Sequence, residues 1–349
     1  MAIAAVKLKG REIGPHKAIV APLLNSRTVL TNSPWTFVAL WLQRNRKPKA
    51  VFYWEQAQEF HKVSVGLPLR SAPLLLYYCF MNAAKALLVA KGISLDERHG
   101  VTAHPKVAPG IRRTFPGEGI KIHSTGILPS LSAYYGEVET SKTHTLQELF
   151  FNMVFIHRTY CLTYSSQKEM FLPLANCGYV YDTQTKDVFF KADIEKNIPL
   201  NLAVKRLPIT FVAAPAIGPR AIRSAATLVW RKPRQPTATN IEELIAFNRR
   251  LRQDLHFISG TQTLWYLKTP VPRPSRLKRQ LPTLVLAAMH RLSEICRYQP
   301  LQLELFLAGQ KNWLLSEFIE MSPIQFIDEM ASEITGYQFL VPNVRAASS

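Results

Sequence analysis

Basic and aromatic residues alternate between residues 228 and 279. The segments LVWRKPRQP, RLRQDLHF and WYLKTPVPRPSRLKR place cations beside Trp230, Phe257, Trp265 and Tyr266. Cations bind phosphates and aromatic rings stack on bases, a combination that single-stranded nucleic-acid binders use. The predicted contacts to nucleic acid are Arg231, Lys232, Arg234, Arg249, Arg252, Lys268, Arg273, Arg276, Lys278 and Arg279. In the alternative interpretation, the rings belong to the core and only the charges reach solvent.

Polar residues also interrupt the most apolar stretch of the chain, RSAPLLLYYCFMNAAKALLVAKG, at residues 70–92. This stretch predicts a central helix, on which Tyr78, Asn82 and Lys85 share one face because positions three and four apart are neighbours. In one interpretation these side chains line a polar pocket in which Lys85 binds an anion. In the other, Asn82 bonds the backbone of a neighbouring helix and Lys85 extends its amine to the surface.

The same stretch has the length of a membrane span, about 20 residues. An amide and an amine at its centre instead favour a buried helix of a soluble protein, because a charge is costly at the middle of a bilayer. The four cysteines form no CxxC pair, and the N-terminal sequence lacks the long apolar core of a signal peptide. These features predict a cytoplasmic protein with no membrane contact.

The net charge of +19 is unevenly distributed along the chain. Residues 1–50 contain 9 Lys or Arg against 1 Asp or Glu, and residues 205–279 contain 15 against 3. We expect these two segments to form one basic surface. Clustered positive charge favours a polyanionic partner, most often nucleic acid. An acidic protein subunit is the alternative partner.

Other motifs that carry chemistry are missing from the sequence. It contains no GxGxxG after a predicted strand, no P-loop, no HExxH and no GxSxG. His123, His144 and His157 are isolated and are interpreted as structural histidines. We therefore predict no metal site and no cofactor.

The expected elements come in blocks rather than in βα alternation, which argues against a doubly wound parallel sheet. Helices are expected from Ser33 to Gly92, strands around residues 120–127, and a helix that begins at Thr145 with Glu148 completing a capping box. A hairpin with its turn at residues 182–186 and two further short strands follow. A helix over residues 239–259, a Pro-rich linker and three more helices from Pro282 complete the chain.

Two sequence blocks carry a family resemblance. YWEQAQEFHKVSVGLPLRSAPLLLYYCFMNAAKALLVAKG, followed by RHG, resembles the front part of the YaaC-like family of prokaryotic proteins. LSEICRYQPLQLELFLAGQKNWLLSEFIEMSPIQFIDEMASEITG resembles the C-terminal part of that family. The front block is also similar to the helical HEPN superfamily, which includes RNA-cleaving toxins and antiviral effectors.

The resemblance implies an α+β fold that is mainly α-helical, with a HEPN-like helical bundle and a β-rich middle segment. The predicted parts are a basic N-terminal segment (1–32), a HEPN-like helical region with a short β insertion (33–168), a β-rich segment (169–238) and a C-terminal helical region (239–349).

Many HEPN nucleases carry an Arg followed after four to six residues by a His, and the two side chains meet at a dimer interface. The resemblance implies this catalytic role for Arg98 with His99 and His104, or for Arg250 with His256. Arg would stabilise phosphate charge and His would transfer a proton, and attack by an RNA 2′-hydroxyl needs no metal. Gly100 and Pro105 place the first pair on a loop, whereas the motif usually lies on a helix. Alternatively, the first pair caps a helix end and the second lies on a solvated helix face.

The functional expectation is therefore a nucleic-acid-associated effector or adaptor of a prokaryotic defence or toxin-type system, with RNA as the favoured ligand. Metal-independent RNase activity and a homodimer through the helical region are part of this expectation. The alternative is a non-catalytic interaction subunit whose basic surface docks an acidic protein partner. A small-molecule enzyme that uses Lys85 in a pocket is a third interpretation.

Overall fold

The chain forms two compact units, and each contains segments that are distant in sequence. The computed structural model describes residues 2–105, 114–271 and 275–340. Unit 1 comprises Met1–Leu30, Glu169–Val271 and Gly336–Ser349, and unit 2 comprises Thr31–Lys168 and Pro272–Thr335. The predicted N-terminal and β-rich segments thus fall mainly in unit 1, whereas the predicted C-terminal region is divided between the units.

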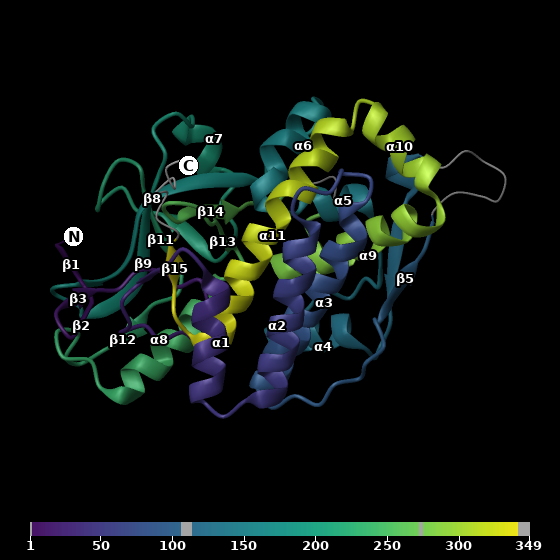
Figure 1. The fold of residues 1–349 in the computed structure, drawn as a ribbon. Coiled ribbons are helices and arrows are strands. Elements are labelled where there is room, and N and C mark those ends of the chain that lie inside the picture. The colour runs from purple at the N-terminus through teal and green to yellow at the C-terminus, as the bar shows by residue number, and fades with distance from the viewer. Residues whose placement is uncertain (1, 106–113, 272–274, 341–349) are drawn as a thin grey trace, which may run out of the picture. The chain divides into compact units, whose positions relative to one another are not determined.

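An eight-stranded antiparallel sheet forms the centre of unit 1 (Figure 1). The strand order is β10-β11-β9-β8-β14-β13, and in addition β1 pairs with β8 and β12 with β9. The strands are β1 (Ile3–Ala5), β8 (Phe171–Asp182), β9 (Asp187–Ile194), β10 (Phe211–Ala213), β11 (Ala221–Ser224), β12 (Leu228–Val229), β13 (Leu255–Ile258) and β14 (Leu264–Lys268). The hairpin predicted at residues 182–186 is confirmed, because β8 and β9 pair on either side of this turn.

Helix α8 (Ala238–Leu251) packs on this sheet. Leu244, Phe247 and Leu251 are three or four positions apart and join the same apolar core as the strands. The remaining elements of unit 1 are short: helix α7 (Leu200–Val204), the β2–β3 hairpin (Lys7–Leu8 and Arg11–Glu12) and the parallel pair of β4 (Val29–Leu30) with β15 (Phe339–Leu340).

The predicted helix over residues 239–259 is wrong at both ends. It begins one residue after Thr237, whose side chain accepts from the main chain of Asn240, and it ends at Leu251. The residues that follow form β13, in which Phe257 opposes Trp265 of β14. Antiparallel pairing with the next strand, β14, determines the structure of this segment, and the helical periodicity of the preceding residues does not continue into it.

Unit 2 is built around helix α3 (Ala72–Ala90), which contacts α2, α4, α9 and α11 (Figure 1). The helices of this unit are α1 (Pro34–Arg44), α2 (Pro48–Ser64), α3, α4 (Ile127–Tyr135), α5 (Leu146–Phe151), α6 (His157–Thr163), α9 (Leu281–Tyr298), α10 (Pro300–Ala308) and α11 (Asn312–Thr335), with short 3₁₀ turns at Phe115–Gly117 and Val154–Ile156. The helices expected between Ser33 and Gly92 and after Pro282 are confirmed.

The predicted β insertion is a three-stranded sheet of β5 (Val101–Ala103), β6 (Gly119–Ile122) and β7 (Thr143–Thr145). Ile127, expected on a strand, instead begins α4. The capping box of Thr145 and Glu148 is confirmed. The helix that it starts is nevertheless short, because α5 ends at Phe151 and the next α-helix, α6, begins only at His157.

The predicted fold class is wrong. Helices account for 44% and strands for 18% of the described residues, and the large antiparallel sheet of unit 1 is a second structural centre beside the helices. The helices of unit 2 are also interleaved with a sheet of their own. The fold is α+β, but the expected HEPN-like helical bundle does not describe it.

Helix α3 is the one described helix that is long and apolar enough to cross a membrane. In its most apolar window, 72% of the residues are buried inside the protein. This burial is that of a core helix, as expected from the polar residues at its centre.

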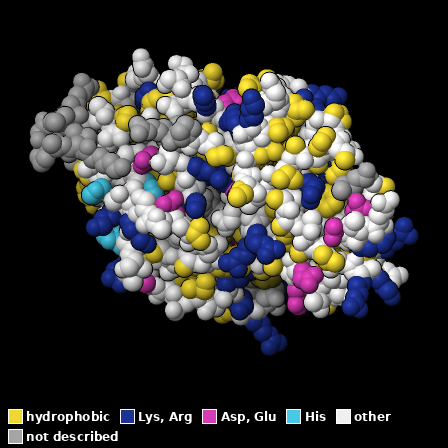
Figure 2. Space-filling model, turned by 180° about the vertical axis from the view of Figure 1, so that it is seen from behind, with side chains coloured by type: hydrophobic (Ala, Val, Ile, Leu, Met, Phe, Trp, Pro, Cys, Tyr) yellow, Lys and Arg dark blue, Asp and Glu magenta, His cyan; other side chains and the backbone are white. Residues whose placement is uncertain are grey.

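Positive charge is divided between the two units. Unit 1 contains 20 Lys or Arg against 9 Asp or Glu, and unit 2 contains 23 against 15. On the face drawn in Figure 2, these side chains stand in several separate groups with hydrophobic and uncharged surface between them. Part of the charge of unit 1 is internal, since Lys17, Arg252 and Lys268 are each only 1% exposed.

Candidate functional site

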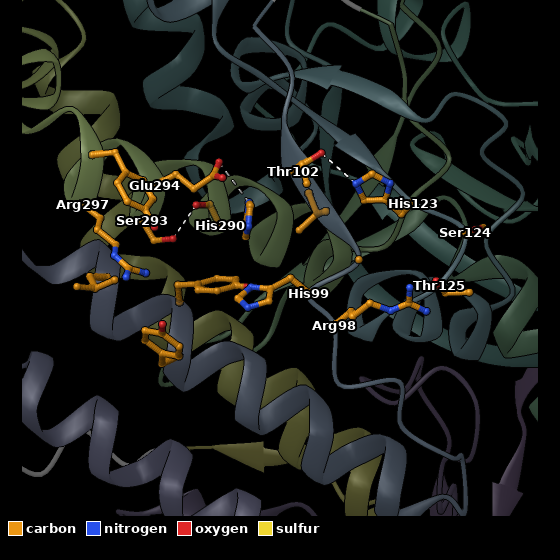
Figure 3. A pocket seen from close by; sticks show the side chains of 16 residues that line it. Arg98, His99, Thr102, His123, Ser124, Thr125, His290, Ser293, Glu294 and Arg297 are labelled. Atoms are coloured by element: carbon orange, nitrogen blue, oxygen red, sulfur yellow. Dashed lines mark hydrogen bonds and ion pairs between the residues drawn. The ribbon is translucent and has the colours of Figure 1, made fainter.

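A cavity of about 690 Å³ lies within unit 2 and is called here the unit 2 cavity (Figure 3). Three parts of the chain line it: helix α3, the loops around β5 and β6, and the second half of α9. The lining residues are Leu74, Tyr77, Tyr78, Arg98, His99, Gly100, Val101, Thr102, His123, Ser124, Thr125, His290, Ser293, Glu294, Arg297 and Tyr298. Its volume is in the range of small-molecule and nucleotide sites.

The wall from α9 follows directly from helical spacing. His290, Ser293, Glu294 and Arg297 follow one another at intervals of three, one and three positions, so they share one face of the helix. The opposite wall contains Tyr77 and Tyr78 of α3. Because α3 and α9 pack against each other, these two faces open onto the same cavity.

The floor holds the segment RHG, which the main chain fixes against the start of α4. The carbonyl oxygens of Arg98 and His99 accept from the N–H groups of Ile127 and Leu128 at 2.8 and 3.2 Å, and the carbonyl of Gly100 accepts from His123 at 2.9 Å. The first N–H groups of a helix have no partner within the helix, so these bonds satisfy two of them. Arg98 and His99 are thereby held at the cavity.

Gly100 is required at this position for two reasons. Its φ of +75° is unfavourable for other residues, and a Cβ there would lie 2.4 Å from Cδ of Pro129 and 2.9 Å from the carbonyl oxygen of Thr125. Gly92 has a similar φ of +76°, but a Cβ at Gly92 would meet no atom within 4 Å. A comparison of alanine substitutions at the two glycines therefore separates the cost of the positive φ from the cost of the close contacts.

We expect Gly100→Ala to lower the free energy of unfolding by at least about 2 kcal/mol more than Gly92→Ala, because both share the cost of a positive φ but only Gly100 has a clash. Chemical denaturation of both variants measures this difference. Equal losses would show that the close approach of residues 98–100 to α4 contributes nothing to stability.

His99 is the histidine best placed for chemistry. It is exposed, its Nδ1 lies 2.5 Å from the hydroxyl of Tyr77, and its ring stacks on that of Tyr77 at 5.4 Å. Partial burial of the ring against its neighbours, followed by the charge of Lys85, lowers the pKa of His99. Burial also raises the pKa of Tyr77, so this phenol stays protonated. When His99 carries its hydrogen on Nδ1, Tyr77 accepts it and Nε2 is left as a base.

His290 is a different kind of histidine. It is 5% exposed, and its ring meets that of His99 edge-on at 5.8 Å. Burial, then the neighbouring His99 and Arg291, lower its pKa to about 3. Its Nδ1 lies 3.7 Å from the Glu294 carboxylate, which also pairs with Arg291 at 3.1 Å. His290 therefore stays neutral and supports the cavity wall.

Two arginines bring positive charge to the cavity. Arg98 pairs with Asp96 at 2.6 Å and its side chain is 74% exposed, and this pairing lowers the pKa of Asp96 to about 2. Arg297 is exposed and lies over the ring of Tyr298 at 5.0 Å. In the view of Figure 3, His99 lies between these two arginines. The Arg98 guanidinium points away from His99, toward Thr125, so it would have to leave Asp96 to hold a phosphate beside the ring.

The members of each predicted Arg–His pair lie in different surroundings. Arg98 and His99 line the cavity, whereas His104 follows β5, is exposed and does not line it. Arg250 is exposed at the end of α8, and His256 is 4% exposed on β13 with its ring against Phe171. The second pair is predicted on one helix, but α8 ends at Leu251, so Arg250 is on the helix and His256 is on the strand that follows.

The predicted stripe on α3 is only partly in the cavity. Tyr78 lines it, but Asn82 and Lys85 do not. Asn82 donates to the carbonyl of Tyr78 in its own helix at 3.0 Å rather than to a neighbouring helix, and the Lys85 amine lies over the ring of Tyr53 at 5.3 Å. Lys85 acts on the cavity only through its charge near His99.

The predicted binding residues of the basic segment divide by burial. Arg252 donates to the carbonyl of Lys17 at 3.2 Å inside unit 1, and Lys268 is equally buried. Trp230, Phe257 and Trp265 are buried too, so they belong to the core, as in the alternative interpretation. The exposed or half-buried members are Arg231, Lys232, Arg234, Arg249, Arg276 and Lys278, and Arg273 lies outside the described residues.

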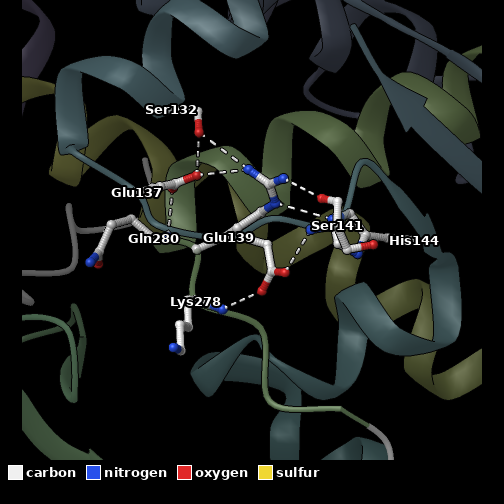
Figure 4. Close-up of polar contacts among 8 residues, drawn as sticks. Ser132, Glu137, Glu139, Ser141, His144, Lys278 and Gln280 are labelled. Carbon is white, nitrogen blue, oxygen red and sulfur yellow. Dashed lines mark hydrogen bonds and ion pairs between the residues drawn. The ribbon is translucent and has the colours of Figure 1, made fainter. Parts of the chain in front are cut away.

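Arg279 has a structural role (Figure 4). Its side chain is 3% exposed and pairs with Glu137 at 3.1 Å. It also donates to the carbonyl of Ser141 at 2.8 Å and to Nε2 of His144 at 3.1 Å. These contacts fasten the segment before α9 to the segment after α4, and they leave Arg279 unavailable to a ligand.

Sequence reasoning missed most of the unit 2 cavity. His290, Glu294 and Arg297 lie in a helix that the sequence predicts. Their spacing puts them on one face of this helix, and this shared polar face could have indicated the site. His123 was interpreted as structural, but it is exposed and lines the cavity, with Nε2 3.0 Å from the hydroxyl of Thr102. His144 and His157 are buried and hydrogen-bonded, as predicted.

No group of three or more His, Cys, Asp or Glu side chains is placed to hold a metal ion in residues 2–105, 114–271 and 275–340. All four cysteines are free thiols.

Comparison with known proteins identifies a family but no characterised neighbour. No curated protein and no solved structure matches the chain. The family described as YaaC-like protein matches residues 26–334, a range that includes every residue lining the unit 2 cavity. The chain therefore belongs to the YaaC-like protein family.

Proposed function

We propose that the unit 2 cavity binds single-stranded RNA and cleaves it without a metal ion. The observation that carries this proposal is that Arg98, Arg297 and the two exposed histidines, His99 and His123, gather in one cavity with exposed or half-buried tyrosines. Guanidinium groups bind phosphates, tyrosine rings stack on bases, and histidines transfer protons near neutral pH.

The proposed reaction is transesterification at phosphorus. Nε2 of His99 takes the proton from a ribose 2′-hydroxyl, and the 2′-oxygen forms a bond to the phosphorus. The bond from phosphorus to the 5′-oxygen breaks, and His123, an exposed histidine that lines the cavity, donates a proton to that oxygen. The products are a 2′,3′-cyclic phosphate and a 5′-hydroxyl, with no net gain or loss of protons or electrons.

The arginines have the second role in this proposal. Arg98 can exchange its surface pairing with Asp96 for a phosphate, because an exposed ion pair is worth only about 0–1 kcal/mol. Arg297 lies in the α9 wall of the cavity, across from the wall that α3 forms. The adjacent residue, Tyr298, is 65% exposed. A base stacked on this ring would place its phosphate within reach of Arg297.

Binding is tested separately from cleavage. We expect Arg98→Gln with Arg297→Gln to weaken binding of a fluorescent single-stranded RNA at least 10-fold, because two phosphate contacts are lost. The matched control is Arg231→Gln with Lys232→Gln, which removes two exposed cations of unit 1. Fluorescence anisotropy at increasing salt measures both, and affinity should fall steeply with salt.

Equal losses in both double variants would argue against a specific role for the unit 2 cavity. Absence of RNA binding at low salt, together with capture of an acidic protein partner, would favour the non-catalytic interaction subunit instead. We place the activity in the cytoplasm of a prokaryotic cell, where free thiols stay reduced, and in a defence or toxin-type system. A homodimer through the helices of unit 2 remains part of the proposal.

A further inference from the structure

A second cavity, of about 390 Å³, lies within unit 1 and is called the unit 1 cavity. The β2–β3 hairpin and the turn before β4 form its walls, so it is independent of the RNA site proposed above. Arg11, Arg27, Ser26 and Thr28 line it, with Gln338 and His16. Apart from Glu12, these polar side chains are hydrogen-bond donors or hydroxyl groups.

His16 gives this cavity a buried donor. The residue is 2% exposed, and its Nδ1 accepts from the N–H of Ala18 at 3.0 Å. The neutral ring must then carry its hydrogen on Nε2, and Nε2 has no hydrogen-bond partner within the described part of the chain. Buried donors are nearly always paired in folded proteins, so this atom points to an acceptor that the protein does not itself supply.

The surroundings of His16 keep it neutral and keep the field positive. Burial, then the charges of Arg252 and Lys17, lower the pKa of His16 to about 3. Both cations are anchored, since Arg252 donates to the carbonyl of Lys17 and the Lys17 amine donates to the carbonyl of Phe339 at 2.7 Å. An anion next to His16 would therefore be attracted by two fixed positive charges that act on this residue.

The other lining groups also favour an anion. Gln338 accepts the N–H of Lys17 at 3.3 Å through Oε1, which leaves its NH₂ group as a donor. Glu12, the single carboxylate among the lining residues, lies 3.9 Å from the Lys7 amine, and its side chain is 71% exposed. The positive charge of the two arginines thus exceeds the negative charge of Glu12, whose carboxylate faces solvent and Lys7.

We propose that the unit 1 cavity binds a phosphate group, with Arg11 and Arg27 as its cationic ligands and the Nε2–H of His16 as an inner donor. A phosphate offers acceptor oxygens on all sides, and arginine binds two of them at once. The hydroxyl groups of Ser26 and Thr28 add further donors. The phosphate is either free in solution or the terminal group of a nucleotide.

Calorimetry on the full chain tests the proposal, with Arg98→Gln and Arg297→Gln present so that the unit 2 cavity does not contribute. Inorganic phosphate should bind at one site per chain. Adding Arg11→Gln and Arg27→Gln should weaken binding at least 10-fold, whereas adding Lys196→Gln and Lys205→Gln, two exposed cations of unit 1 that do not line the cavity, should leave it unchanged. No binding of phosphate, or the same loss in both pairs, would overturn the proposal.

A second readout is independent of the arginine variants. In protein labelled with ¹⁵N-histidine, the Nε2–H signal of His16 should move on addition of phosphate, because its donor gains an acceptor. Adenosine 5′-monophosphate in a parallel titration distinguishes the two sources: tighter binding than phosphate identifies a nucleotide, and equal binding identifies the phosphate group alone. A His16 signal unaffected by saturating phosphate would remove this residue from the site and refute the inference.

Discussion

His99→Gln is expected to lower the rate of RNA cleavage by about 100- to 10,000-fold, which is the usual contribution of a general base. Glutamine keeps a polar group of similar reach, but it cannot take a proton from the 2′-hydroxyl. RNA affinity should change by less than 3-fold, because the proposed phosphate ligands are Arg98 and Arg297. Single-turnover cleavage of a short RNA in EDTA, combined with anisotropy for binding, separates the two effects.

The matched control for this experiment is His104→Gln. His104 is exposed and five residues further along, but it does not line the cavity. We expect this variant to cleave RNA at the rate of the unmodified protein. A loss at His104 equal to the loss at His99 would contradict the site as described, and so would full activity of His99→Gln.

The pH dependence of cleavage gives a further check on His99. The base must be neutral, so the rate should fall as the pH drops through the pKa of His99, which burial and Lys85 hold below the ordinary value of 6.5. Lys85→Met removes that neighbouring charge, so the pKa of His99 should rise and the acid limb of the profile should move to higher pH. Lys85 does not line the cavity, so a merely structural role of Lys85 would not produce this shift.

Much of the fold was accessible to sequence reasoning where local signals agree with the tertiary structure. The helices of unit 2 have strong apolar periodicity, and Thr145 with Glu148 gives a capping box that the structure contains. The prediction failed at residues 252–259, where pairing with β14 overrides the helical pattern. It also failed for the fold class, because periodicity does not show that strands far apart in sequence join one large sheet.

The site was less predictable, because its residues come from segments about 200 positions apart. Arg98 and His99 were singled out only through a resemblance, and their expected partner, His104, does not line the cavity. Burial explains the other failures: charge counting cannot distinguish Arg231, which is exposed, from Arg252 and Arg279, which are internal. An arginine in a basic segment fulfils its hydrogen-bonding capacity inside the protein as readily as on a ligand.

Arg279 provides the second large expected effect, this time on stability. Arg279→Met should lower the free energy of unfolding by about 3–5 kcal/mol, the usual cost of removing one partner of a buried ion pair. Glu137, whose side chain is fully buried, would lose its counter-charge. Lys278→Met is the matched control: Lys278 is adjacent but exposed, and only its main-chain N–H bonds Glu139, so the expected change is below about 0.5 kcal/mol.

The pH dependence of Arg279→Met separates a charge effect from a packing effect. Burial already raises the pKa of Glu137 in the presence of Arg279, and loss of the arginine should raise it further. A carboxyl group with a raised pKa in the folded state binds a proton more readily than in the unfolded state, so it gains stability as the pH falls. The deficit of Arg279→Met measured by denaturation should therefore shrink between pH 7 and pH 5, and Arg279→Met combined with Glu137→Gln should recover part of it at pH 7. A deficit that is independent of pH, and that the second substitution does not reduce, would mean that Arg279 stabilises unit 2 by filling space and by its bonds to Ser141 and His144 rather than by neutralising Glu137.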